Sequence, residues 1–131
     1  MSEPLAGAAT ALRRADLLER RGRVRDVIGL GVEASGLDAE VGEVCLVETG
    51  RDGRPVPAEV VGFRGSATLL MPLGEMHGLG PGKPVAATGE TFRVPVGDAL
   101  LGRVVDGFGE PLDGPQLALS ARRPALAPPP A

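Results

Sequence analysis

Short apolar runs with alternating side chains, separated by glycine-containing turns, constrain the fold of this chain most strongly. Within Gly22–Gly36, the apolar residues Val24, Ile28, Leu30 and Val32 all fall on even positions, which is the period of a β-strand. Further strands are expected over Glu43–Thr49, Pro55–Phe63, Ala67–Met71, Pro84–Ala87 and Thr91–Val96. Six short strands are typical of a small barrel or sandwich, and closure would remove their unpaired edges. The sequence therefore predicts an all-β fold, a small six-stranded closed β-barrel.

Glycines inside and between these runs predict where the barrel bends and turns. Gly29 and Gly31 share the face opposite Val24, where a bulge or sharp curvature would be accommodated. Arg51-Asp52-Gly53 is expected to form the hairpin turn between the second and third strands. Cys45 lies within an apolar strand and is expected to be a small core residue.

The segment before the barrel, residues 4–21, is expected to be a helix. Its apolar residues recur at helical spacing, and its arginines gather toward the C-terminal end, where the helix dipole favours cations. Such a helix either packs on its own barrel or frays, or it docks a partner through a small apolar stripe with a charged flank. The candidate partner-docking residues are Leu5, Leu12, Arg13, Arg14 and Leu17.

The stretch Thr91–Pro115 is expected to be a connector that contains a compact helical turn. Asp98 is placed to cap a one-turn helix over Ala99–Leu101, and Gly102 is placed to end it in the left-handed region. Arg103-Val104-Val105 is a short strand candidate, followed by turn signals at Asp106-Gly107 and Asp113-Gly114.

Residues 116–131 show no period, and Pro128–Pro130 are expected to be extended and exposed. We therefore divide the chain into an N-terminal helical segment over residues 1–21, a barrel domain over 22–96, and a junction with an extended, proline-rich C-terminal linker over 97–131.

Composition limits the class of protein. The chain has 131 residues, enough for one small domain with extensions. Its net charge of −3 and 2% aromatic content disfavour a nucleic-acid surface, which needs a basic groove and stacking platforms. A single cysteine excludes an internal disulfide. Neither an apolar run of about 18 residues nor a secretory signal is present, so we expect no membrane span and a cytoplasmic location.

The segment Gly78-Leu79-Gly80-Pro81-Gly82-Lys83-Pro84 invites comparison with a phosphate-binding loop, and it departs from that motif at two positions. His77 stands where the motif has its first glycine. Pro84 stands where the motif has the Ser or Thr that binds magnesium. We therefore predict a turn here, without nucleotide contact.

Other candidate groups also favour structural roles. Asp106, Glu110 and Asp113 lie in Asp-Gly and proline turns, which explain these carboxylates without acid–base catalysis. His77 is the only histidine and has no neighbouring cysteine or acidic cluster, so a metal site is not expected. We predict no catalytic, cofactor-binding or metal-binding residue in this chain.

The residue sequence of the connector is more informative than its turn and helix signals alone. Thr91–Pro115 contains V-P-V-G-D-A-L-L-G-R-V-V-D-G-F-G-E-P-L-D-G, which resembles the junction between the N-terminal barrel and the nucleotide-binding domain of rotary-type ATPases. Gly22-Arg23-Val24, Ala58–Phe63 and Leu69–Gly74 are similar to barrel segments of the export branch, the flagellar and type III protein-export ATPases. The resemblance covers residues 22–115, and it favours the flagellar over the injectisome system.

This resemblance implies a barrel that helps to hold a homohexameric ring together. It also implies an N-terminal helix that contacts the stator-like regulator of the export apparatus, on the cytoplasmic side of the inner membrane. Full-length members of the family hydrolyse ATP with magnesium to drive protein export. This chain reaches Ala131 before the P-loop lysine of that family could appear, so we expect it alone neither to bind nor to hydrolyse ATP.

Three alternatives remain at the level of the sequence. The first alternative is a free-standing β-barrel interaction module. The second is an α/β-type subunit fragment of a rotary ATP synthase, and the third is an oligonucleotide-binding barrel. The third is disfavoured by the charge and aromatic content given above.

Overall fold

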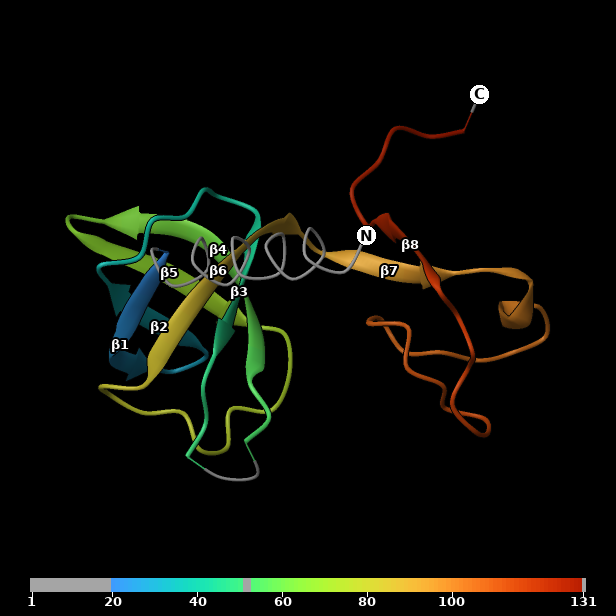
Figure 1. Ribbon diagram of the computed structural model, residues 1–131, viewed down its shortest axis with the longest axis horizontal. Coiled ribbons are helices and arrows are strands. Elements are labelled where there is room, and N and C mark those ends of the chain that lie inside the picture. The colour runs from blue at the N-terminus through green and yellow to red at the C-terminus, as the bar shows by residue number, and fades with distance from the viewer. Residues whose placement is uncertain (1–19, 51–52, 131) are drawn as a thin grey trace, which may run out of the picture. The chain divides into compact units, whose positions relative to one another are not determined.

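The computed structural model describes residues 20–50 and 53–130, and these fall into two compact units that divide between Glu90 and Thr91. The first unit is a barrel and the second contains a two-stranded ribbon (Figure 1). Each unit is described by itself. Within the described ranges, no helix is long and apolar enough to cross a membrane.

The first unit is a closed β-barrel of six strands, as predicted, with the neighbour order β1-β2-β5-β4-β3-β6 (Figure 1). Adjacent strands along the chain mostly pair as antiparallel hairpins, while β6 closes the barrel between β1 and β3. The strands are β1 Arg21–Ile28, β2 Gly31–Ser35, β3 Glu43–Val47, β4 Val56–Arg64, β5 Ala67–Pro72 and β6 Pro84–Thr91.

The barrel interior is filled by small and β-branched side chains, because so narrow a barrel has little room for large ones. Leu70 is the largest side chain that is fully buried. Cys45 is also fully buried, as predicted for a small core residue. The buried core cluster comprises Val24, Val32, Ala34, Cys45, Val47, Ala58, Val60, Leu70, Val85 and Ala87.

The single strand predicted over Gly22–Gly36 is wrong, because this run forms the β1–β2 hairpin. Gly29, with a φ of 60°, and Leu30 form a two-residue turn, the length favoured for tight hairpins. Ile28 pairs with Gly31, so the turn alone exchanges the residues that face the core, and the bulge between Val24 and Asp26 exchanges them back. Val24 and Val32 therefore both fall on even positions, and the run resembles one strand. Ile28 lies between the bulge and the turn, on the face away from the core, and Leu30 lies in the turn, so both are exposed. The bulge expected at the glycines lies instead between Val24 and Asp26.

The sixth strand predicted over Thr91–Val96 is also wrong as a barrel strand. β7, Arg93–Val96, pairs antiparallel with β8, Ala121–Pro124, in a separate two-stranded sheet. The tail over residues 116–131 is thus not wholly an extended linker, because part of it is a strand. Prolines are tolerated in this ribbon because both of its strands are edge strands.

The helical turn in the connector differs from the prediction in its cap. It is a 3₁₀ helix, η1, over Asp98–Leu100; Gly97 is its N-cap residue and no side chain caps it. Gly102 does adopt the left-handed region, with a φ of 73°. Arg103-Val104-Val105 is not a strand; a single bridge joins Val105 to Pro111.

The helix predicted over residues 4–21 overlaps the described residues only at its end, where Arg21 is already the first residue of β1. Residues 4–19 lie outside the described residues, so the rest of that prediction stays open.

Leu70 allows a test of the barrel core. Replacing Leu70 with Ala should lower the free energy of unfolding by about 2–5 kcal/mol, because the packed interior cannot fully close over the lost methyl groups. Chemical denaturation followed by circular dichroism measures this change. Leu30→Ala is the control: that side chain is 79% exposed, and its loss should change stability by about 0.5 kcal/mol or less. Equal effects of both substitutions would contradict this assignment of the core.

Candidate functional site

The glycine-rich loop before β6 is closed by its own backbone hydrogen bonds. The Gly82 amide donates to the Val24 carbonyl at 2.7 Å, and the Lys83 amide donates to the Gly80 carbonyl at 3.4 Å. The Leu79 amide donates to the Met76 carbonyl at 3.1 Å. A phosphate cradle needs free amides that point to the ligand. These amides are already occupied, and the loop is a turn as predicted.

Three carboxylates of the second unit, those of Asp106, Glu110 and Asp113, lie in or beside its turns. Asp106 Oδ1 accepts hydrogen bonds from the Phe108 and Glu110 amides, each at 2.9 Å. Asp113 accepts from the Val104 amide at 3.0 Å and from Arg103 Nε at 2.9 Å. These contacts, the amide first and the guanidinium second, hold the pKa of Asp113 below its ordinary value. Their arrangement supports the prediction that these residues shape turns.

His77 and Cys45 lie in different environments, His77 on the surface and Cys45 in the barrel interior. Nδ1 of His77 lies 3.3 Å from Oε2 of Glu75, and both side chains are exposed. Burial, followed by the charge of Glu43, raises the pKa of the Cys45 thiol to about 12. Among the described residues, no group of three or more His, Cys, Asp or Glu is arranged to hold a metal ion. The candidate docking residues Leu5, Leu12, Arg13, Arg14 and Leu17 lie outside the described residues.

Two depressions with largely apolar linings lie on the barrel surface. The first, which we call the groove, has a volume of about 260 Å³ and lies over β2 and β5, with walls from the end of β1 and from β4. Its apolar wall residues include Ile28, 58% exposed, and Met71, 50% exposed. An ion pair between Glu33 and Arg64 lies among its lining residues. Leu30 projects from the adjoining hairpin turn.

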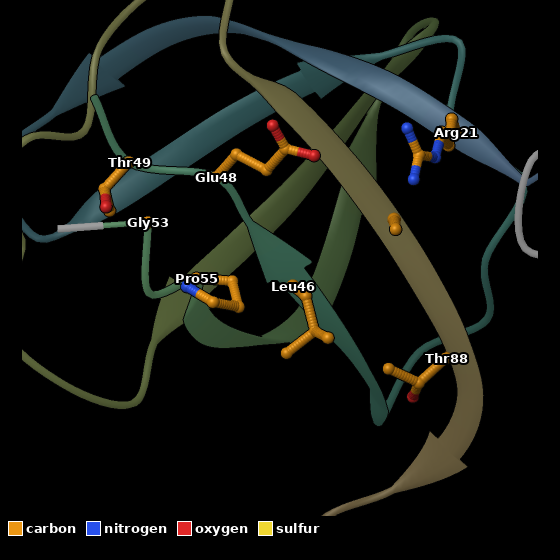
Figure 2. Close-up of a pocket in the computed structure, with 8 residues that line it drawn as sticks. Arg21, Leu46, Glu48, Thr49, Gly53, Pro55 and Thr88 are labelled. Atoms are coloured by element: carbon orange, nitrogen blue, oxygen red, sulfur yellow. The ribbon is translucent and has the colours of Figure 1, made fainter. Parts of the chain in front are cut away.

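The second depression, which we call the hollow, has a volume of about 330 Å³ and lies between β3 and β6. Figure 2 shows Leu46 and Pro55 with the polar side chains of Arg21, Glu48 and Thr88 around them. The Thr88 hydroxyl donates to the Val44 carbonyl at 2.6 Å, which fixes one wall of the hollow. An apolar floor with a polar rim is the composition of a protein contact surface.

The groove and the hollow lie on opposite sides of the barrel. In the closed order β1-β2-β5-β4-β3-β6, strand β2 is three places from β3, and β5 is three places from β6. The groove is centred on β2 and β5, and the hollow on β3 and β6. Sequence reasoning missed both, because they depend on the strand order.

The comparisons with known proteins agree on one family. Residues 24–89 match the ATP synthase alpha/beta family, beta-barrel domain. The chain is 48% identical over 100 residues to the flagellum-specific ATP synthase of Bacillus subtilis (strain 168), covering 76% of this chain and 23% of that protein. It is 47% identical over 104 residues to the flagellum-specific ATP synthase of Treponema pallidum (strain Nichols), covering 79% and 23% respectively.

A type 3 secretion system ATPase from Xanthomonas euvesicatoria is 47% identical over 96 residues, covering 72% of this chain and 22% of that protein. The matched region thus spans less than a quarter of the length of these relatives.

Cys45 provides a test of the site chemistry, because it is the only cysteine in the chain. At pH 8, iodoacetamide should alkylate the folded protein on the order of a thousand-fold more slowly than the protein in urea, since few thiols with so high a pKa are ionised. Mass spectrometry measures the extent of alkylation over time. Alkylation of the folded protein as fast as that of the protein in urea would contradict the prediction.

Proposed function

The chain belongs to the ATP synthase alpha/beta family, and on that premise we propose that it is the N-terminal, ring-assembling barrel of a flagellar or type III protein-export ATPase. The relatives described above support the export branch, because each is a flagellum-specific ATP synthase or a type 3 secretion system ATPase by name. In this proposal the barrel contributes contacts between subunits, and a nucleotide-binding domain of the longer protein supplies ATP hydrolysis.

The observation that carries the assembly role is the placement of the groove and the hollow on opposite sides of one barrel. Two different faces that bind each other give a head-to-tail contact, which closes into a ring if the rotation between subunits allows it. One shared face would instead give a two-fold dimer. In the proposed contact, the side chains around the groove of one copy meet the apolar floor of the hollow of the next.

The other roles rest on family resemblance. We propose that residues 1–19 include the docking segment for a regulator of the export apparatus, and that the protein acts in the cytoplasm beside the inner membrane. A fragment of a rotary ATP synthase subunit and a free-standing interaction module are the alternative functions. Both would use the same barrel, and the assembly experiment below separates a self-associating barrel from one that binds other proteins only.

Assembly is tested with one charged substitution on each face. Met71→Glu places a carboxylate in the groove and Leu46→Glu places one in the hollow, so neither variant should self-associate. A mixture of the two should form a complex, because each variant keeps the face that the other has lost. Sedimentation velocity at high protein concentration measures this, since a contact of one barrel with another is small and weak.

Val41→Glu is the matched control, because Val41 is 64% exposed and lies on neither face. It should associate like the unmodified chain. Circular dichroism establishes that each variant is folded. If the parent chain stays monomeric at millimolar concentration, the assembly role is wrong. If the parent associates and the mixture does not, the pairing of these two faces is wrong.

The chain alone should neither bind nor hydrolyse ATP. Its one Gly-Lys pair, Gly82-Lys83, lies in the closed turn described above, and Lys83 Nζ lies against Gly50, only 2.7 Å from where a Cβ atom would stand. Calorimetric titration with ATP and magnesium should show no heat of binding, and a phosphate-release assay should show no turnover. Magnesium-dependent turnover by the purified chain would contradict this proposal.

A further inference from the structure

The carboxylate of Glu43, at the start of β3, is buried and fully engaged. The residue is 6% exposed. Its Oε1 accepts a hydrogen bond from the Gly89 amide at 2.6 Å. Its Oε2 accepts from the Glu40 amide at 3.1 Å and from Arg20 Nη2 at 3.0 Å. A buried carboxylate persists only with such compensation, so these donors depend on one another through a shared acceptor.

Arg20 holds the chain where it enters the barrel. Besides Glu43, its guanidinium reaches the Asp38 carbonyl from Nε at 3.2 Å. Its own carbonyl accepts from the Ala87 amide at 3.1 Å. Residues 1–19 precede it in the sequence. Arg20 is thus the first described residue along the chain, and both its side chain and its backbone are hydrogen-bonded to the barrel.

Gly89 lies where the chain leaves the barrel, one residue before the end of the first unit at Glu90. Its φ of 75° favours glycine. A Cβ atom there would lie 3.1 Å from Arg20 Nη1, a tight contact. The backbone conformation and the close guanidinium thus both restrict this position to glycine.

We propose that Glu43 couples the start of the barrel to its end, so that a partner protein drawing Arg20 away from the barrel loosens the backbone at Gly89, next to the second unit. The physical step is local. Without Arg20, the buried charge of Glu43 loses its cation and turns toward water, and the Gly89 and Glu40 amides lose their acceptor. By linkage, disturbing Gly89 must weaken the hold on Arg20 to the same extent.

Amide hydrogen exchange in the full chain tests the forward direction. Arg20→Gln should speed exchange at the Gly89 and Glu40 amides about ten-fold or more, which corresponds to losing a hydrogen bond to a charged group. Amides of the β2–β5 pairing should keep their rates, which separates local loosening from global unfolding. Arg25→Gln, in the same strand region and with the same loss of charge, is the matched control and should leave the Gly89 amide unchanged. Unchanged exchange at Gly89 in Arg20→Gln would overturn the coupling.

Limited trypsin digestion tests the reverse direction, because trypsin cleaves after arginine. Gly89→Ala should speed cleavage after Arg20 several-fold. Gly65→Ala is the matched control: Gly65 has a φ of 60° and open space around its Cβ position, so that substitution adds similar backbone strain away from Arg20. If Gly89→Ala does not fold, Glu43→Gln replaces it, with the same expected rise in cleavage. Equal cleavage rates in the test and control variants would overturn the reciprocal coupling.

Discussion

The geometry at both ends of the barrel depends on the hydrogen bonds of the buried Glu43 carboxylate. Its acceptor oxygens gather donors from three separate parts of the chain: Arg20, Glu40 and Gly89. A charge in this position would be costly if any of these donors were missing. The segment that precedes β3, the residue that leads into β1 and the end of β6 are therefore fixed together. The strands form the barrel wall, and the Glu43 carboxylate holds the positions where the chain enters and leaves that wall.

The narrow interior explains why the apolar surface exists. A barrel of this size is filled mainly by small and β-branched side chains such as Ala34, Cys45 and Val60 around Leu70, which leaves little room inside for further large apolar residues. Ile28, Leu30 and Met71 accordingly remain exposed. Their distribution over one side, with the hollow on the other, follows from strand order and closure. The same packing limit that defines the core thus supplies surfaces suited to association.

The sequence predicted the fold class and the place of Cys45 in the core. It failed where two different structures share one sequence pattern. The barrel has six strands as predicted, yet two of them come from Gly22–Gly36, and Thr91–Val96 contributes none. The turn at Gly29 and Leu30 and the bulge between Val24 and Asp26 each shift the alternation by one residue, so their effects cancel and periodicity alone cannot reveal the turn. Pairing of residues 93–96 with 121–124 is a long-range contact, which local propensity does not encode.

The candidate site was predictable only in part. Cys45 in the core and the turn role of Asp106 followed from local chemistry, because each depends on near neighbours in the sequence. The groove and the hollow could not be found that way. Each collects residues from strands that are distant in sequence, and their opposition depends on the order in which the barrel closes. The partners of Glu43 were missed for the same reason, since Arg20 and Gly89 lie far from it along the chain.

The position of β6 has a consequence for biosynthesis. This strand is the last of the barrel to be translated, yet it lies between β1 and β3. A nascent chain that has emerged only as far as Gly82 therefore carries a curved sheet with two bare edges, which invite pairing with other nascent chains. Closure becomes possible only once residues 84–91 leave the ribosome. The interval between those two points is when this protein is most exposed to aggregation and most in need of a chaperone.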